Sequence, residues 1–547
     1  MNMNLGSSYC FDDILMEPLF SDITTRSSIS LETNIATNGR SLVLKTPLIS
    51  SPMDTVTETD MAIKMALNGG LGIIHRYMDI DSQVSQVIKV KRFLQYIIQK
   101  PYTLTIYNTL DEIMNFQSLY NVSSFCVIDN SSGIDKLLGI LTRRDIDYMK
   151  HCQNYYNANM SMSIKTMVNI SDFMSTQLIT IDILNIKNNY NVEYTLENTI
   201  RVAKDLMYKH KIEKIPIVSN NSLVGLITLK NIRHYDNNKF KACIDNNGAL
   251  CVGAAIGIVD DYIERLSQLV EAGVDLICID VANGFNINVF NAINIIRSKY
   301  PLLVLMVGNV CNWNAYAALS QYDVDCVRVG VGNGSICTTR LETGIGKGQF
   351  SAVIECFQYK INVENANRIM PNIICDGGSL GKTGNKVKAL ACGASAIMLG
   401  RTLASTEESP GIIIYRNGKR FKYIRGMASS MANLSKQEKT NSPISTNSPI
   451  SPISTNSLNS LNSTISSTNS KPLTYSKHSE GVDGEQELSG SVVDVIEQIN
   501  GGIKSGMSYL GCINIKQLHD KSEKGEIKFN LVTSIGMSEN GIRVKTY

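Results

Sequence analysis

A glycine-rich stretch near the middle of the chain, RVGVGNGSICTTRLETGIGKG, places three reactive side chains close together. It runs from residue 328 to residue 348 and presents Ser335, Cys337 and Thr339 after a run of alternating glycines. Glycine lets the backbone turn its N–H or C=O groups towards a ligand or ion without obstruction. A cysteine becomes a nucleophile when positive charge or hydrogen bonds stabilise its thiolate, and a serine can donate to a phosphate. On spacing alone, however, a small buried cysteine without a catalytic role is a better explanation of Cys337 than a nucleophile.

Short apolar segments alternate with helical patterns along the chain, and each is followed by polar or glycine residues. These elements would position residues 328–348. The expected strands lie within residues 43–54, 71–76, 249–257, 276–284, 302–310, 325–332, 372–378 and 396–401. Nearly all-apolar strands alternating with helices indicate a parallel sheet buried on both faces. Eight such strands close a barrel, whose active site lies at their C-terminal ends. We therefore predict an α/β fold with a (β/α)8 TIM barrel, in preference to an open doubly wound sheet.

About 150 residues interrupt this alternation, and they contain an internal repeat. The segment SSFCVIDN…LLGILTRRDI (123–146) is echoed by EKIPIVSN…LVGLITLKNI (213–232), and each reads strand, turn, strand, helix. Duplicated units of this kind commonly pack as a pair. We expect residues 1–89 and 241–547 to form the barrel and residues 90–240 a separate inserted domain. Residues 435–470, rich in Ser, Asn, Thr and Pro, are expected to be a mobile or disordered segment.

Composition excludes several classes of function. A formal net charge of +3 over 547 residues gives no reason to expect a nucleic acid or an anionic membrane as partner. The 13 cysteines are scattered without a C-x-x-C pair, which argues against a zinc site and a disulfide framework. The first residues lack a basic and an apolar region, so we expect no signal peptide, and the longest apolar run is too short to span a bilayer. We expect a cytoplasmic protein.

The string GxGxGSICTTR followed by TGxG resembles the catalytic loop of the IMP dehydrogenase/GMP reductase family. The resemblance covers nearly the whole chain outside residues 435–470, although the family loop usually has Pro where this chain has Asn333. It implies an oxidoreductase that acts on a purine nucleotide with a nicotinamide cofactor, and a homotetramer. The repeat resembles a CBS pair (Bateman module), which would bind an adenine or guanine nucleotide. Thr142 and Asp145 fit the ribose-binding motif of that module, but the second repeat has Asn231 where Asp is expected, and a purely structural insert is an equal alternative.

The resemblance also implies roles for individual residues. Cys337 would attack C2 of the purine, and Thr339 and Glu480 would move the proton of the departing group. Asp376 would accept hydrogen bonds from the ribose hydroxyls, although an aspartate that caps a helix is the plainer alternative. The nucleotide-binding set implied in full is Ser335, Asp376, Gly377, Gly378, Gly400, Arg401, Gly426, Met427, Ala428 and Gly481.

Two further sets follow from the same resemblance. The cofactor would contact Asp280, Val281, Ala282, Asn283, Val331 and Gly332. A potassium ion would bind Gly332, Gly334 and Cys337 through their carbonyl oxygens, with Arg340 nearby. Arg26 and Arg76 could meet the 2′-phosphate of NADPH. Ile424 occupies the position where the family usually has a tyrosine that contacts the phosphate.

The direction of the chemistry depends on the segment after Arg425. Dehydrogenases of the family activate water with an Arg-Tyr pair on a mobile flap, but here no arginine lies between Arg425 and Arg543, and Tyr475 follows Thr474. The strings IDVANGF, QFSAVIEC and RGMASSMA also resemble GMP reductases, whereas SSPMDTVTE and GGIKSGMSYLG resemble dehydrogenases. We predict an NADPH-dependent GMP reductase. The alternatives are an NAD-dependent IMP dehydrogenase with another base, such as Lys477, and a nucleotide sensor of the CBS type that has lost catalysis.

Overall fold

The computed structural model describes residues 6–93, 97–98, 101–120, 122, 124–131, 133–159, 169–190, 196–238, 241–364, 368–378, 381–428, 480–533 and 536. The serine- and asparagine-rich segment 435–470 and residues 474–479 lie outside the described residues. The chain divides into two compact units, residues 1–90 with 251–547 and residues 91–250. Within the described part, no helix is both long and apolar enough to cross a membrane.

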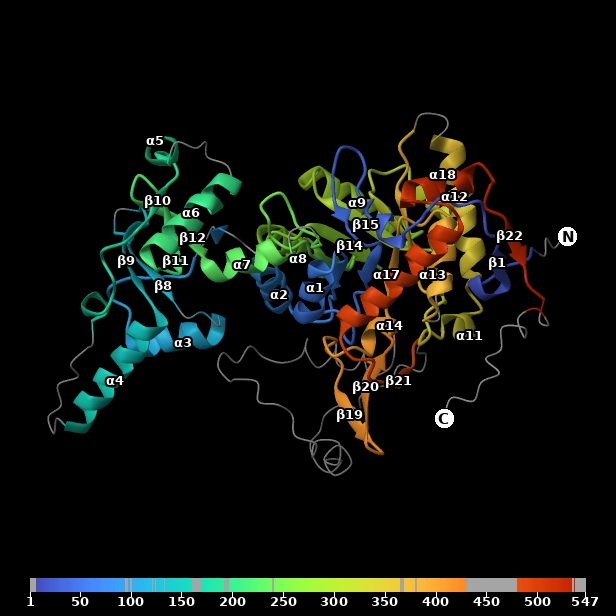
Figure 1. The fold of residues 1–547 in the computed structure, drawn as a ribbon. Coiled ribbons are helices and arrows are strands. Elements are labelled where there is room, and N and C mark those ends of the chain that lie inside the picture. Colours follow the sequence, from blue (N-terminus) through green and yellow to red (C-terminus); the bar gives the residue numbers. More distant parts are fainter. Residues whose placement is uncertain are drawn as a thin grey trace, which may run out of the picture. The chain divides into compact units, whose positions relative to one another are not determined.

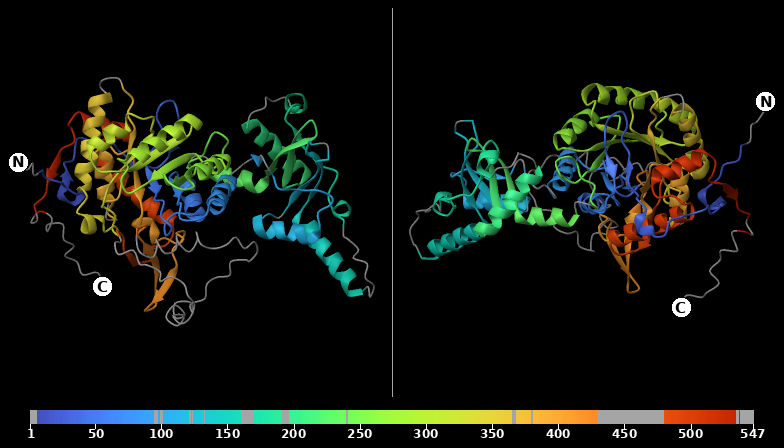
Figure 2. Two further views of the ribbon diagram at one scale, coloured as in Figure 1. Left: turned by 180° about the vertical axis from the view of Figure 1, so that it is seen from behind. Right: turned by 45° about the horizontal axis from the view of Figure 1, so that its top comes forward.

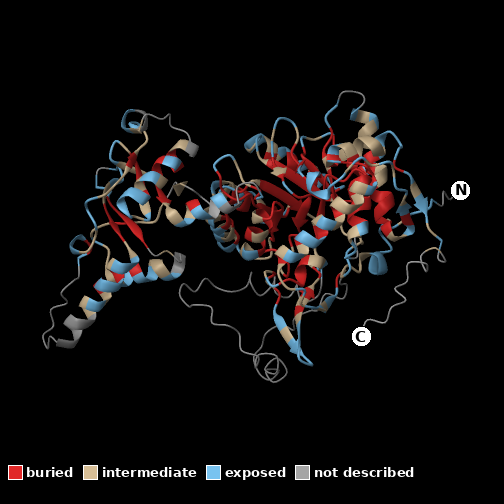
Figure 3. Ribbon diagram, in the orientation of Figure 1, coloured by how far each residue is buried: buried red, intermediate tan, exposed pale blue. Residues whose placement is uncertain are grey.

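Eight parallel strands of the first unit close into a barrel, as the sequence predicts (Figure 1). In chain order they are β4 (Leu48–Ser50), β5 (Leu71–Ile74), β13 (Gly253–Ile256), β14 (Leu276–Asp280), β15 (Val304–Val310), β16 (Cys326–Val329), β17 (Asn372–Asp376) and β18 (Ala396–Leu399). The ring closes where β5 pairs with β13 and β18 pairs with β4. Their side chains are almost all buried, so the strands form the core in Figure 3. This burial on both faces accounts for their continuous apolar sequences.

Helices surround the barrel (Figure 2). They are α1 (Thr59–Leu67), α2 (Ile80–Phe93), α8 (Tyr262–Glu271), α9 (Ile287–Lys299), α10 (Trp313–Leu319), α11 (Thr339–Thr343), α12 (Gln349–Glu364), α13 (Thr383–Ala391), α14 (Arg401–Ala404), α17 (Val492–Tyr509) and α18 (Ile515–Glu523). Helix α17 packs closely on α13, because Gly502 and Gly506 leave room for Thr383 and Val387. A three-stranded antiparallel sheet of β19 (Ile413–Arg416), β20 (Lys419–Arg425) and β21 (Asp483–Glu487) follows the barrel and extends from it.

The second unit is built from two similar halves. The first contains β7 (Thr103–Leu104), α3 (Leu110–Tyr120), β8 (Phe125–Asp129), β9 (Lys136–Leu141) and α4 (Arg143–Asn159). The second contains β10 (Ile181–Asp182), α5 (Ile186–Tyr190), α6 (Leu196–His210), β11 (Lys214–Ser219), β12 (Ser222–Thr228) and α7 (Leu229–Asn238). One sheet runs through both halves in the order β10-β11-β12-β9-β8-β7, with β6 (Ile97–Ile98) beside β12. Each repeat therefore has the predicted order of strand, turn, strand and helix, while its identity as a CBS motif stays a prediction.

The motif expected to bind ribose in this unit has a structural role in the described conformation. Asp145 accepts hydrogen bonds from the Thr142 N–H, at 2.8 Å, and from the Thr142 hydroxyl, at 2.6 Å, at the start of α4. In the second repeat, the Thr228 hydroxyl accepts from the N–H of Asn231 at 3.1 Å. In the first repeat the Asp145 carboxylate therefore accepts from the residue before α4, and in the second repeat the Thr228 hydroxyl caps α7. These contacts give both motifs a structural role, and nucleotide binding by this unit stays a prediction.

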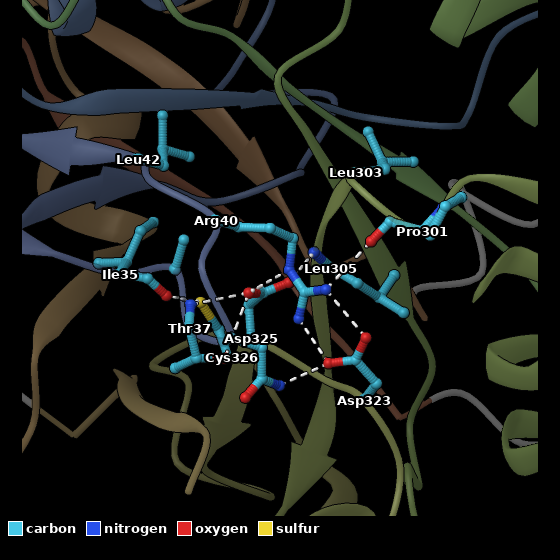
Figure 4. Close-up of polar contacts among 12 residues, drawn as sticks. Ile35, Thr37, Arg40, Leu42, Pro301, Leu303, Leu305, Asp323, Asp325 and Cys326 are labelled. Carbon is cyan, nitrogen blue, oxygen red and sulfur yellow. Dashed lines mark hydrogen bonds and ion pairs between the residues drawn. The ribbon is translucent and has the colours of Figure 1, made fainter. Parts of the chain in front are cut away.

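A buried carboxylate at the start of β16 holds the N-terminal segment against the barrel (Figure 4). Asp325 is fully buried and accepts hydrogen bonds from Arg40 Nε and Arg297 Nη2, each at 2.8 Å. It also accepts from the backbone N–H of Thr37, at 2.8 Å, and of Leu305, at 2.9 Å. Arg40 reaches the neighbouring Asp323, and this hydrogen bond lowers the pKa of Asp323. One side chain therefore joins the N-terminal segment, α9, β15 and β16.

We expect Asp325→Ala to lower the free energy of unfolding of the barrel by about 3 kcal/mol or more, because two guanidinium groups and two N–H groups lose a buried acceptor. Urea unfolding of the full chain measures the effect. The matched control is Asp323→Ala, whose side chain is 43% exposed and whose loss should cost about 1 kcal/mol or less. Equal losses in the two variants would contradict the central role of Asp325.

Candidate active site

A cavity of about 390 Å³ lies at the C-terminal ends of the barrel strands. It is lined by residues that follow β4, β5, β14, β15, β16 and β17, together with residues 426–428 and Glu480. Because parallel strands bring their C-terminal ends to one face, these short loops converge although they are distant in sequence. The predicted site residues that line the cavity are Cys337, Thr339, Glu480, Asp280, Val281, Ala282, Val331, Gly332, Gly334, Asp376, Gly377, Gly426, Met427 and Ala428.

Three of these side chains form a connected series. The Sγ atom of Cys337 lies 3.1 Å from the hydroxyl of Thr339, and that hydroxyl donates to Oε2 of Glu480 at 2.8 Å. Since the Thr339 hydroxyl donates to the carboxylate, its oxygen is left to accept from the thiol. The series can therefore pass a proton between a nucleophile and a carboxylate in the cavity.

Backbone contacts bring Glu480 to the cysteine loop across 141 residues of sequence. The Glu480 carbonyl accepts from the N–H of Thr338 at 2.9 Å, and the N–H of Val482 donates to the carbonyl of Ile336 at 3.0 Å. Cys337 and Gly481 form an antiparallel bridge between these two hydrogen bonds. The N–H of Gly426 also donates to Val482, so the segments on both sides of residues 429–479 meet at the cysteine loop.

A buried guanidinium joins two carboxylates at the bottom of the cavity. Arg328 on β16 donates to Asp280 at 2.7 Å and to Asp376 at 2.8 Å, and its side chain is 6% exposed. Asn309 on β15 donates to the same Asp376 oxygen at 2.8 Å. The two carboxylates expected to contact cofactor and nucleotide are thus held by one cation.

Several buried polar atoms around the cavity have no hydrogen-bond partner among the described residues. They are Arg76 Nε, Asn309 Oδ1 and Arg328 Nε on lining residues, and Asp54 Oδ1 next to the lining residue Met53. An unsatisfied buried polar atom costs free energy, so such atoms call for a ligand or water. Arg76 lies over the ring of Tyr77, 5.1 Å from its centroid. The Arg76 and Arg328 side chains, each with such a donor, both contact Asp280, so this part of the cavity fits the polar nicotinamide dinucleotide that the family resemblance implies.

The remaining predicted residues lie outside the cavity lining. Gly400 is close to the lining residues Ser51 and Met53, and Arg401 donates to Gln486 of β21 at 3.1 Å. Ser335 is exposed, and Asn283 accepts from the N–H of Phe285 in an exposed turn. Gly378 packs against the side chain of Gln349, and Gly481 forms the β-bridge with Cys337. Ile424 is buried within β20. Arg26 lies in a short 3-10 helix, Arg26–Ser28, away from the lining.

The loop proposed to bind potassium is already internally bonded. The carbonyl of Gly334 accepts from the N–H of Cys337 at 3.1 Å. The side chain of Arg340 packs over Gly332 and Gly346 and donates to Asn333 and to the carbonyl of Lys347. A carbonyl oxygen has two lone pairs, so this hydrogen bond leaves the Gly334 oxygen able to accept a cation as well. Potassium binding by this loop stays a prediction.

Sequence reasoning missed the ion pairs that support the cavity. Arg328 interrupts the apolar strand DCVRVGVG, and a charge inside a buried strand was the available signal. Arg425, the last residue of β20, pairs with Asp54, whose N–H lies 3.4 Å from the sulfur of Met427. This contact places residue 427, expected to face the purine, beside the loop after β4.

Burial distinguishes the cysteines near the cavity. It raises the pKa of Cys278 to about 11 and the pKa of Cys375 to about 12. Cys278 lies 3.4 Å from Arg328, and Cys375 lies 3.3 Å from the side-chain amide of Gln349. Both thiols stay protonated near neutral pH, whereas Cys337 lines the cavity and adjoins a proton-transfer series.

Comparison with known proteins agrees with this geometry. The family model described as the IMP dehydrogenase / GMP reductase domain matches residues 8–543. The inosine-5′-monophosphate dehydrogenase of Nitrosopumilus maritimus is 34% identical over 95% of this chain and 96% of its own, and that of Bacillus subtilis is 35% identical over 97% and 94%. A GMP reductase variant of Trypanosoma brucei, solved with guanosine 5′-monophosphate, is 29% identical, covers 99% of both chains and superposes with a TM-score of 0.78.

We expect iodoacetamide at pH 8 to modify Cys337 in the native protein and to spare Cys278 and Cys375. At that pH the two buried thiols are ionised to about one part in a thousand or less, and only a thiolate attacks the reagent. Peptide mass spectrometry measures the three rates, with the exposed Cys10 as an internal reference. Modification of Cys278 or Cys375 as fast as Cys337 would show that Cys337 is not the reactive thiol of the cavity.

Proposed function

This chain belongs to the IMP dehydrogenase / GMP reductase family, and from that premise we propose that it is a GMP reductase. The reaction is GMP + NADPH + 2H⁺ → IMP + NH₄⁺ + NADP⁺. The observation that carries the proposal is a complete Cys337–Thr339–Glu480 series in a chain without an arginine between Arg425 and Arg543. The series supplies a nucleophile and a proton donor for loss of ammonia. The chain lacks the arginine with which, by the family resemblance, the dehydrogenase activates water.

The side chains of the cavity would supply the nucleophile and the proton that releases ammonia, which takes its second proton from solvent. The Cys337 thiolate adds to C2 of the purine, and the Glu480 carboxyl passes a proton through the Thr339 hydroxyl to the departing amino group. Ammonia leaves, and a thioimidate remains between Sγ and C2. NADPH, when bound, supplies the hydride that this carbon accepts. The C2–S bond then breaks, and the thiolate is restored as IMP leaves.

The nucleotide and the cofactor would occupy neighbouring parts of the cavity. Asp376, held by Arg328, would accept from the ribose hydroxyls, and residues 426–428 would face the base. Backbone N–H groups of residues 377–378 and 400–401, with Ser335, would bind the phosphate. On the other side, Asp280 to Asn283 and Val331 would contact the cofactor. The free Nε of Arg76 would add a donor for an anionic group such as the 2′-phosphate.

The names of the sequence relatives favour a second candidate, an NAD-dependent IMP dehydrogenase. Relatives that carry this name are 34–35% identical along nearly their entire length. The reaction would be IMP + NAD⁺ + H₂O → XMP + NADH + H⁺, and hydrolysis of the thioimidate would need a base other than arginine. The sequence offers Lys477, which lies outside the described residues.

The proposal also covers the oligomeric state and the inserted unit. We propose a homotetramer, and a CBS pair in residues 90–240 that binds an adenine or guanine nucleotide. A GMP reductase of Trypanosoma brucei, solved with guanosine 5′-triphosphate, covers 97% of this chain with a TM-score of 0.68. Its similarity supports the proposal that this chain binds a guanine nucleotide besides its substrate.

A paired assay on the full chain tests the proposal. We expect GMP with NADPH to give a loss of absorbance at 340 nm, matched mole for mole by ammonia, and we expect no NADH from IMP with NAD. Cys337→Ser is the negative control and should lose both signals. NADH formed from IMP, with no turnover of GMP, would instead identify a dehydrogenase.

Thr339→Val tests the proton-transfer series separately. Valine keeps the shape of the side chain but removes the hydroxyl between the thiol and Glu480. We expect kcat to fall by about 10²-fold or more, which is typical for the loss of positioned acid–base catalysis. Thr343→Val, at the end of α11, is the matched control, because the described contacts of its hydroxyl are with the Thr339 carbonyl and the Ile345 N–H and not with the thiol or Glu480. A kcat within twofold of the wild type in Thr339→Val would remove this residue from the mechanism.

A further inference from the structure

We propose that Gln349 is a positioning residue that fixes the cysteine loop against the nucleotide-binding end of β17, with Asn333 as its contact on the loop. The inference rests on the proposed function, because it concerns how Cys337 and Asp376 are aligned for one substrate. Gln349 is the first residue of α12 and is 1% exposed. Burying a polar amide costs free energy unless the amide is hydrogen-bonded, so the hydrogen bonds of Gln349 indicate its role.

The side-chain amide of Gln349 joins the ends of two neighbouring strands. Its Nε2 donates to the carbonyl of Val329, the last residue of β16, at 2.7 Å. It also donates to the carbonyl of Asp376, the last residue of β17, at 3.2 Å. One loop leads from Val329 to Cys337, and the other begins at Asp376. A single buried amide therefore sets the spacing of the two loops where they leave the barrel.

Glycines occur where the two loops approach each other and this amide. A Cβ at Gly330 would lie 2.0 Å from the Asp376 carbonyl oxygen, and one at Gly378 would lie 2.6 Å from the Cβ of Gln349. Both glycines have positive φ, +151° and +75°, so a side chain there would strain the backbone as well. The two loops can therefore approach each other and Gln349 this closely only because glycines occupy these positions.

Asn333 extends the contact into the cysteine loop. Its Nδ2 donates to Oε1 of Gln349, and its Oδ1 accepts from the guanidinium of Arg340. Its Cβ also lies 3.3 Å from the position that a Cβ on Gly377 would take. The loop is therefore held on both sides of Cys337, by Asn333 before it and by Arg340 after it. Where related loops usually have the rigid ring of proline, this chain has an amide that acts through hydrogen bonds.

This arrangement has a direct consequence for catalysis. A nucleotide held by Asp376 presents its base to Cys337, so the reaction depends on the distance between two loops that no covalent bond fixes. A misplacement of about 1 Å can reduce a rate by 10²-fold without abolishing binding. Gln349 and Asn333 should accordingly affect kcat more than nucleotide affinity.

Two variants and one control test the inference. Gln349→Leu keeps the volume and removes every hydrogen bond, and Asn333→Asp keeps the acceptor for Arg340 but removes the donor to Gln349. Gln321→Leu, at an exposed glutamine, is the matched control. For each protein we would measure kcat in whichever reaction the wild type performs, the Kd of GMP by calorimetry, the thermal midpoint, and the rate of iodoacetamide modification of Cys337.

We expect Gln349→Leu and Asn333→Asp each to lower kcat by about 10-fold or more, to change the Kd of GMP by less than about threefold, and to change the modification rate of Cys337 by about fivefold or more. The control should leave all four quantities unchanged. Wild-type kcat and wild-type thiol reactivity in both variants would overturn the inference, as would a loss of activity that only follows a lower thermal midpoint. The thiol rate needs no turnover, so it tests the inference even if the wild type reduces no GMP and the proposed function fails.

Discussion

The buried guanidinium of Arg328 is the interaction on which the candidate site depends. Asp280 and Asp376 end two strands on either side of β15 and β16, and both carboxylates face one cavity with little solvent to screen them. Like charges in such surroundings repel strongly, and a shared cation converts the repulsion into two short hydrogen bonds. The same cation fixes the side of each carboxylate that remains available to a ligand. In the proposed function, this pair of contacts would set where substrate and cofactor lie, before any loop contributes.

Much of the fold follows from the sequence, for identifiable reasons. The eight strands are predictable because each is nearly all apolar and is followed by turn residues. Eight parallel strands of this kind can close into a barrel. The support of the site was not predictable in the same way. Arg328 lies 48 residues from each of its two carboxylates, and no local pattern joins them. Glu480 was assigned from a motif alone, because a contact across a long segment of low complexity has no physical signature in sequence.

The two candidate reactions share the thiolate addition to C2 and a thioimidate. In the reductase the amine would leave and the thioimidate carbon would then accept a hydride, whereas in the dehydrogenase C2 would lose a hydride to NAD⁺ and water would then hydrolyse the thioimidate. The barrel, the Arg328 network and the cysteine loop are common to either chemistry, so a match along the entire chain identifies the family and leaves the reaction open. The sequence difference that separates the two proposals lies after Arg425, where this chain has no arginine before Arg543.

The position of the inserted unit has a consequence for how the chain folds. Strands β5 and β13 are direct neighbours in the barrel, yet the whole second unit lies between them in sequence, and β4 finds its other neighbour only in β18. On a ribosome, the first two strands emerge long before the partners that cover their edges. The inserted unit has hydrophobic clusters of its own and can fold before those partner strands are made. Barrel closure is then a late event of high contact order, because the edge of β5 is unpaired until β13 is made and the edge of β4 until β18 is made.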